Sequence, residues 1–188
     1  MSLELFDASY YLAANPDLAA VGIVNPDRLY RHFQTSGLEE GRAFSPFVNL
    51  NYYREQNPEL AFAGLTSNSQ ILKHLEDWGI AEGRSFSPLF DLKYYVNTDP
   101  GLASAFAGNL EGAFQHFLTR GFAENRRFSQ FIDLDYYLAV NPDLEQALGG
   151  DRRAAFYHLV NTGIAEGRRY LPGDIGVINS SHTVGSDP

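Results

Sequence analysis

Four histidines are the side chains of this protein best suited to acid–base or metal chemistry, and they recur at a constant spacing. His32, His74, His116 and His158 follow one another at intervals of 42 residues. Imidazole titrates near neutral pH and is a common zinc ligand, so a recurrent histidine suggests a proton-transfer group or a metal ligand. A glutamate and an arginine follow each histidine at fixed distances: Glu40 and Arg42, Glu82 and Arg84, Glu124 and Arg126, Glu166 and Arg168.

The sequence lacks the other residues that either chemistry needs. Each copy offers one histidine and scattered carboxylates, and the chain has no cysteine. Helices that pack lie about 8–10 Å apart, so histidines from stacked copies cannot share one zinc, whose ligands lie about 2.1 Å from the metal. Calcium-loop, phosphate-loop, nucleophile-elbow and His-Glu-x-x-His motifs are absent. We predict no catalytic residue, no metal ligand and no cofactor; an enzyme or metal-binding module built on the four histidines stays open as an alternative.

The histidines belong to a four-fold internal repeat without insertions or deletions. The most visible marker is a tyrosine pair, found at Tyr10-Tyr11, Tyr52-Tyr53, Tyr94-Tyr95 and Tyr136-Tyr137. The pattern predicts an array over residues 1–172 with units 5–46, 47–88, 89–130 and 131–172. Residues 173–188 show no helical pattern and are predicted to be a flexible tail or linker. A fixed period of this length is typical of repeat proteins, whose function depends on surfaces more often than on a cleft.

Composition limits the classes of partner. Hydrophobic residues make up 44% of the chain, enough for a packed core, and the net charge is −9. An acidic chain without basic runs is repelled by phosphate backbones, which argues against nucleic acid as a partner. No apolar run approaches the ~20 residues that cross a bilayer, and the start of the chain lacks a signal-peptide pattern. We expect a soluble chain that does not insert into membranes.

Each unit begins with the signature of a short helix. Asp7 is the predicted N-cap, and Phe6 and Tyr11 stand at the two positions that form a hydrophobic staple. The helix must end before Pro16, because a residue that precedes proline avoids the α conformation. Asn15 is then expected to cap a second short helix that begins with the proline. The equivalent residues of the other three units support the same assignments.

A third helix is predicted from the cap residue Asn25 to Gly37. Gly37 and its equivalents are interpreted as left-handed C′ residues of a Schellman ending. The closing turn reads Glu-Gly-Arg in three units and Glu-Asn-Arg in the third. The exchange of Gly41 for Asn125 predicts a positive φ at this position, since asparagine tolerates it best after glycine.

The ionisable residues that recur in register are expected to be structural. Arg42 is predicted to meet free helix carbonyls or to pair with Glu40 or with an Asp7-type cap of a neighbour. His32 is expected to bond a backbone carbonyl or a tyrosine hydroxyl of an adjacent unit. The second tyrosine of each pair is assigned to the staple, and the first is expected to pack toward the neighbouring unit.

These elements together predict an all-α protein of four 42-residue repeats in a solenoid-like or compact superhelical array. Contacts are expected to run between neighbouring units, as in other repeat proteins. Replacing His74 in an inner unit should then destabilise the protein more than replacing His158 in the last unit, which has one interface rather than two.

Positions that differ between the units are the candidates for binding. The only tryptophan, Trp78, occupies a helix-end position that holds Ser36, Arg120 or Thr162 in the other units. This variation indicates a position that faces solvent, so Trp78 and Arg120 are candidate contact residues. The alternative for Trp78 is a ring that folds back over the neighbouring unit.

The repeat is similar to a known class of bacterial sequences. Asp-x-x-Tyr-Tyr-Leu-x-x-Asn-Pro-Asp, at Asp133 to Asp143, and the closing Ala-Glu-Gly-Arg resemble short tandem repeats of large cyanobacterial and proteobacterial proteins. Such repeats lie beside haemolysin-type calcium-binding or other extracellular domains, and sometimes beside glycosyltransferases. The resemblance covers residues 5–172 and departs from the pattern at Asp99-Pro100-Gly101 and Asn125.

The resemblance implies a non-catalytic accessory module of a secreted or cell-surface protein. Together with the array, it leads us to expect a module for protein or glycan interaction. A purely structural spacer between domains is the alternative. The sequence does not specify the partner or the oligomeric state.

Overall fold

The computed structural model describes residues 5–173, and every regular element in this range is helical. The predicted all-α class with four repeated helical units is therefore confirmed. The chain forms two compact units, of which the first ends at Gln130 and the second begins at Phe131. The first holds repeats one to three and the second holds repeat four. The predicted tail, apart from Gly173, lies outside the described residues.

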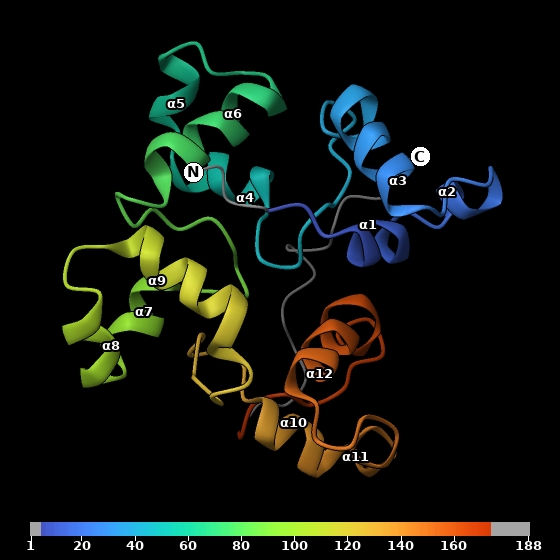
Figure 1. The fold of residues 1–188 in the computed structure, drawn as a ribbon, viewed down its shortest axis with the longest axis vertical. Helices are drawn as coiled ribbons and strands as arrows, with labels where there is room; N and C mark the ends of the chain where they lie inside the picture. The colour runs from blue at the N-terminus through green and yellow to red at the C-terminus, as the bar shows by residue number, and fades with distance from the viewer. Residues whose placement is uncertain (1–4, 174–188) are drawn as a thin grey trace. The chain divides into compact units, whose positions relative to one another are not determined.

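Each repeat contains three short α-helices and a π-helical turn, and the helices of one repeat lie together (Figure 1). Repeats one and two consist of α1 (Ala8–Ala14), α2 (Asp17–Ala20), α3 (Pro26–His32) and η1 (Phe33–Gly37), then α4 (Leu50–Gln56), α5 (Glu59–Phe62), α6 (Asn68–His74) and η2 (Leu75–Gly79). Repeats three and four consist of α7 (Leu92–Asn97), α8 (Pro100–Ala105), α9 (Leu110–His116) and η3 (Phe117–Gly121), then α10 (Leu134–Val140), α11 (Pro142–Leu148), α12 (Arg152–His158) and η4 (Leu159–Gly163). None of the described helices is long and apolar enough to cross a membrane.

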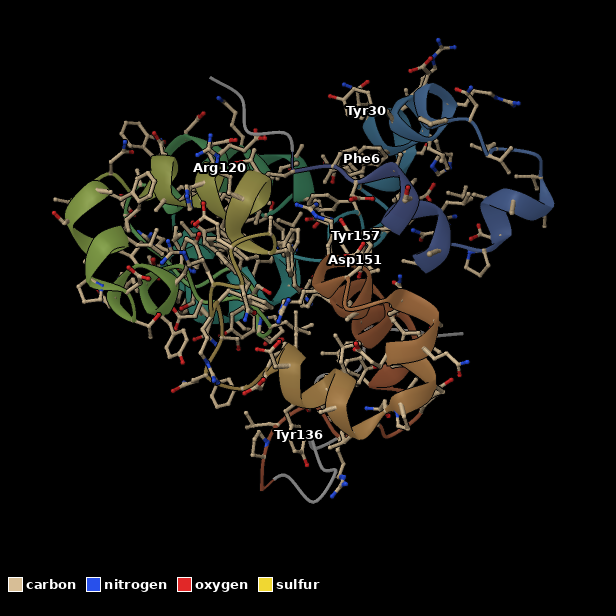
Figure 2. The ribbon with its side chains drawn as sticks, turned by 60° about the horizontal axis from the view of Figure 1, so that its bottom comes forward. Phe6, Tyr30, Arg120, Tyr136, Asp151 and Tyr157 are labelled. Carbon is tan, nitrogen blue, oxygen red and sulfur yellow. The ribbon has the colours of Figure 1, made fainter. Side chains whose placement is uncertain are left out.

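The first helix of every repeat begins at the predicted cap. The Asp7 carboxylate accepts the Tyr10 N–H at 2.8 Å, and Asn49, Asp91 and Asp133 cap their helices in the same way. The predicted staple is present in repeat one, where the rings of Phe6 and Tyr11 lie 5.2 Å apart. Phe6 also lies beside Tyr30 of α3, at 5.2 Å (Figure 2). The cap and the staple thus start the first helix against the third helix of the same repeat.

A backbone hydrogen bond closes each repeat on itself. The N–H of Asp7 donates to the Phe44 carbonyl at 3.0 Å, so the start of repeat one is fastened to its end. The equivalent bonds join Asn49 to Phe86, Asp91 to Phe128 and Asp133 to Tyr170, each at 2.9 Å. The chain therefore returns to its starting point before the next repeat begins.

The capping motif that follows the third helix lies four residues later than predicted. Gly37 does not have a positive φ, and the helix passes through it in the π turn η1, with the Leu38 N–H bonded to the Phe33 carbonyl at 2.9 Å. The assignment of Gly37 and its equivalents as left-handed C′ residues is wrong. The Schellman bonds lie at Gly41, whose N–H donates to Leu38 while the Arg42 N–H donates to Gly37.

The prediction for the closing turn is confirmed. Gly41 has a φ of 73°, and its equivalents Gly83 and Gly167 are also positive. Asn125 has a φ of 52° and is the non-glycine residue with positive φ in the described part of the chain. The Glu-Gly-Arg turn therefore ends each third helix in the left-handed conformation that glycine and asparagine tolerate.

Helix packing is concentrated inside the repeats. The first helix packs on the third in each of them: α1 on α3, α4 on α6, α7 on α9 and α10 on α12. In repeat one this packing buries Tyr11, Leu18, Leu29, Phe33 and Phe44. The expected contacts between neighbours are present, for example between Phe47 and Phe117, but the helices pack mainly inside their own repeat. The closing bond supplies the reason, because it turns the ends of each repeat toward each other.

The closing turn allows a test of backbone conformation alone. Gly167 has a φ of 68°, and a Cβ added to it would meet nothing within 4 Å. We expect Gly167→Ala to lower the free energy of unfolding by about 1 kcal/mol, the cost of a left-handed conformation. Gly167→Asn should cost less, since asparagine occupies this position in repeat three. Urea-induced unfolding followed by circular dichroism measures both, and equal losses would contradict the assignment.

Candidate functional site

The recurrent histidine is bonded to the second tyrosine of its own repeat. The Tyr11 hydroxyl and His32 Nδ1 lie 2.8 Å apart, and the tyrosine has no exposed surface. The other three pairs have the same geometry: Tyr53 with His74 at 2.9 Å, Tyr95 with His116 at 2.7 Å and Tyr137 with His158 at 2.8 Å. The tyrosine hydroxyl was one of the partners predicted for His32, but the predicted location in an adjacent unit is wrong.

The in-register glycine makes room for this bond. A Cβ on Gly37 would lie 1.9 Å from the Tyr11 hydroxyl oxygen and 3.3 Å from His32 Nδ1. The same atom on Gly79 or Gly163 would lie 2.2 Å from the tyrosine hydroxyl of its repeat. No real Cβ tolerates such distances, so a side chain here would push the phenol away from the imidazole. In repeats one, two and four the glycine thus leaves room for the tyrosine hydroxyl, whereas in repeat three a Cβ on Gly121 would first meet the Phe117 ring, at 2.6 Å.

Burial keeps the four bonded tyrosines protonated. It raises the pKa of Tyr11, Tyr53, Tyr95 and Tyr137 to about 12, above the ordinary value of 10.0. In repeat one the charge of Arg42 opposes this rise, while Glu40 and Asp17 add to it. The buried phenol therefore ionises at a higher pH than a free tyrosine does, and it stays protonated and hydrogen-bonded to the imidazole well into the alkaline range.

A buried asparagine joins the end of the first helix to the closing turn. The Asn15 amide donates to the Tyr11 carbonyl at 2.7 Å and to the Ala43 carbonyl at 3.0 Å. Its oxygen accepts from Arg42 Nη1 at 3.5 Å. The predicted role of Asn15 as a side-chain cap of the second helix is wrong, since the cap position is held by Pro16. The amide instead bridges the Tyr11 carbonyl at the end of α1 and the Ala43 carbonyl of the segment that follows the closing turn.

The arginine pairs with two carboxylates of its own repeat. Arg42 donates through Nε to Glu40 at 2.6 Å and through Nη1 to Asp17 at 2.9 Å. Glu40 is the predicted partner, whereas the second partner is Asp17 of α2 rather than an Asp7-type cap. Repeats two and four repeat the arrangement: Arg84 pairs with Glu82 and Glu59, and Arg168 pairs with Glu166 and Asp143.

Repeat three keeps the arginine pair although its residues differ. Asp99 stands at the asparagine position, and Gly101 stands where the other repeats have the second carboxylate. The Asp99 carboxylate bonds Arg126 and also accepts the N–H groups of Gly101 at 2.8 Å and Leu102 at 3.1 Å. Here the residue before proline does cap the second helix, as predicted. The carboxylate of repeat three thus stands two positions earlier in the sequence than in the other repeats, and it still pairs with the guanidinium.

The hydrogen bonds among the recurrent tyrosine, histidine, asparagine and arginine limit the chemistry that these side chains can perform. In repeat three His116 Nε2 lies 3.5 Å from Glu124 Oε1, which completes a row from Tyr95 through the imidazole to a carboxylate. Such a row resembles a proton relay, but the phenol at its end is fully buried and offers no surface to a substrate. Among the described residues, no three histidine, aspartate or glutamate side chains gather as a metal site would require.

The two candidate binding residues lie at the surface. The Trp78 side chain is 61% exposed in η2, so the prediction that this position faces solvent is confirmed. Arg120, at the equivalent position of repeat three, is also exposed (Figure 2). Phe62, at the end of α5, is 92% exposed and was not singled out from the sequence. Its equivalents Ala20, Ser104 and Gln146 are small or polar, and that contrast was the available signal.

The first tyrosines of the pairs have a less uniform setting. Tyr10 is buried, while Tyr52, Tyr94 and Tyr136 are partly exposed. The pKa of Tyr52 is raised by burial and by the charge of Asp91, the cap residue of repeat three. The ring of Tyr52 therefore lies near the next repeat, in the direction expected from the sequence.

Comparisons with known proteins return no relative. No family model matches the chain, and no curated protein or solved structure is significantly similar to it. The four repeats of the chain can instead be compared with one another. They separate the residues that hold a repeat together from those that vary on its surface.

The close approach at Gly37 can be tested with a double-mutant cycle. We expect Gly37→Ala to lower the free energy of unfolding by about 1–3 kcal/mol, because its Cβ overlaps the Tyr11 hydroxyl. In a Tyr11→Phe background the same change should cost less, since the overlapping oxygen is gone. Urea unfolding of the four proteins gives the coupling energy. Additive losses would show that the hydroxyl is not what excludes a side chain at Gly37.

The buried tyrosines predict how stability depends on alkaline pH. Their pKa is raised on folding, so the stability that they contribute is fully present below pH 10 and is lost as the pH rises through about 12. We expect the protein to unfold in this window, with the four phenols ionising as helicity is lost. Near-ultraviolet tyrosinate absorbance and circular dichroism follow the two events. Each Tyr→Phe change should reduce the slope of stability against pH, whereas ionisation of all tyrosines near pH 10 in the folded state would contradict the assignment.

Proposed function

We propose that this chain is a non-catalytic helical-repeat module that binds a protein or a glycan through side chains that differ between its repeats. The recurrent polar side chains support this division. Tyr11, His32, Asn15 and Arg42 and their equivalents are bonded inside their own repeats. Their chemistry is used for folding, which leaves recognition to the variable outward positions.

The observation that carries the proposal is the exposure of two aromatic side chains in repeat two. Phe62 is 92% exposed and Trp78 is 61% exposed. Other repeats hold Ala20, Ser104 or Gln146 at the first position and a serine, arginine or threonine at the second. The fold therefore does not need an aromatic ring at either position. Tryptophan is enriched among residues that dominate binding interfaces, because a rigid ring buries a large area at low entropic cost.

The surroundings of Trp78 suit a polar partner. Glu76 and Asp77 precede it in η2, and Asp77 is paired with Lys73 at 2.6 Å on the exposed surface. An aromatic face beside carboxylates offers a stacking surface and hydrogen-bond acceptors together. Both a glycan and a polar protein surface can use that combination.

The proposed setting is a secreted or cell-surface protein of a bacterium. It rests on the resemblance of residues 5–172 to tandem repeats found beside extracellular domains. The high content of acidic side chains and the lack of cysteine are compatible with such a setting.

A spacer between other domains is the second candidate function, and the closing bonds favour it. Each repeat fastens its own start to its end, so repeats can be added or removed without breaking the others. Deletion of residues 47–88 distinguishes the candidates. A spacer should keep its role with one repeat fewer, whereas a module that binds through repeat two should lose binding.

The binding proposal predicts a specific effect of two substitutions. We expect Trp78→Ser and Phe62→Ser to weaken binding about tenfold or more, without loss of stability, because both introduce residues that other repeats tolerate. Glycan arrays and pull-down from the extracellular fraction identify the ligand, and calorimetry then measures its affinity. Val21→Ala in repeat one is the matched control, since Val21 is 69% exposed and its equivalent in repeat two is alanine. Unchanged binding by both serine variants would reject the surface.

A further inference from the structure

We infer that each repeat is a folding unit of its own, so that one repeat can open while its neighbours stay folded. This device is independent of the proposed binding function. In most helical repeat proteins a single repeat is unstable, and the interfaces between repeats supply much of the stability. The bonds of this protein are distributed in the opposite way.

The bonds that join distant parts of the chain close within a repeat. In repeat two, Asn49 is bonded to Phe86, Tyr53 to His74 and Arg84 to Asn57. Each bond connects the first half of the repeat to its second half. The same three kinds of bond occur in repeats one and four, where Arg42 donates to Asn15 at 3.5 Å and Arg168 donates to Asn141 at 3.1 Å. A repeat therefore contains the partners of its own buried polar groups.

Much of the apolar core also lies within single repeats, although Phe47 of repeat two packs against Phe90, Phe117 and Phe122 of repeat three. In repeat two, Tyr53, Leu60, Ile71, Leu75 and Phe86 are all buried. The first helix packs on the third in every repeat. Repeat four forms a compact unit without any of the other three. Repeats one to three together form the other compact unit, so the separation is clearest for repeat four.

Polar contacts between repeats one and two lie at the start of α6, and two of them are exposed. The Glu39 carboxylate accepts the N–H groups of Asn68 at 3.1 Å and Ser69 at 2.9 Å, at the start of α6. The Asn68 amide donates to the Leu38 carbonyl at 2.7 Å. The two bonds to Glu39 compete with water and contribute little to the stability of either repeat, whereas the bond from the Asn68 amide is partly buried. Ala81, Ala123 and Ala165 stand at the equivalent positions, which shows that a repeat folds without this carboxylate.

The joint between repeats two and three is apolar. The rings of Phe47 and Phe117 lie 5.2 Å apart in an edge-on arrangement. Gly83 lies against Lys93 and Leu110 of the following repeat. An aromatic pair adds about 0.5–1.5 kcal/mol beyond the area that it buries. The free energy that couples repeats two and three should therefore be larger than the one that couples repeats one and two. The hydrogen bonds and core contacts inside each repeat act against this coupling, because they stabilise a repeat independently of its neighbour.

Because these bonds lie within single repeats, the stability losses predicted from the sequence for His74 and His158 change. His74 and His158 make the same bond to a tyrosine of their own repeat, at 2.9 and 2.8 Å. Replacing either histidine should therefore affect its own repeat by a similar amount. The larger loss expected for the inner unit followed from contacts between neighbours, which these histidines do not make.

Hydrogen exchange of the full-length chain tests the inference. We expect Gly79→Ala, whose Cβ would overlap the Tyr53 hydroxyl, to accelerate exchange about 10- to 100-fold in α4 and α6. Peptides from α1 and α3 should stay within about twofold of the wild-type rate. Gly163→Ala is the matched variant and should act on α10 and α12 alone. Mass spectrometry of peptic fragments resolves the repeats, and no ligand is needed.

Two outcomes would overturn the inference. A similar acceleration in all repeats, or loss of the whole fold by Gly79→Ala, would show that the repeats fold as one cooperative array. His74→Ala is the milder second variant, because it removes the bond to Tyr53 without introducing an overlap. If neither variant accelerates exchange in repeat two, the bonds from Asn49 to Phe86, from Tyr53 to His74 and from Arg84 to Asn57 do not hold the repeat together. Failure to find a binding partner would leave both results unaffected.

Discussion

The buried tyrosine hydroxyl is the group that constrains the rest of each repeat. A phenol with no exposed surface must find a hydrogen-bond partner, because an unpaired buried hydroxyl is costly. His32 supplies the partner in repeat one, and Gly37 supplies the space through which the hydroxyl reaches it. The first helix is thereby held against the third, and the π turn brings the glycine under the phenol. In repeats one, two and four the tyrosine, the histidine and the glycine all take part in this contact, while in repeat three Gly121 makes room for the Phe117 ring.

The arginine network shows which property of the repeat is maintained. Three repeats place an asparagine before the proline and a carboxylate two residues after the asparagine. Repeat three has Asp99 and Gly101 there, and Arg126 still has its carboxylate. The quantity preserved is the pairing of the guanidinium with an acid on the second helix or its cap. A charge at the end of one helix and its counter-charge near the start of another keep the closing turn in place.

Local features of the fold could be predicted from the sequence, whereas contacts across a repeat could not. The cap at Asp7 and the positive φ at Asn125 depend on neighbouring residues, so the pattern specifies them. Gly37 was misread because its glycine is required by a distant hydroxyl and not by its own φ. The location of the partner of His32 could not be determined for another reason. In an exact repeat, a contact inside one unit and the same contact to the next unit have identical sequence signals.

The closure of each repeat also bears on where function can arise. When neighbours do not need one another to fold, an outward position is under no packing constraint from them. Such a position can take serine in one repeat and tryptophan in another, as the position of Ser36 and Trp78 does. An exposed aromatic side chain gains nothing for folding and raises the tendency to associate. Its presence in repeat two at two such positions is therefore the basis of our proposal that this surface contacts a partner.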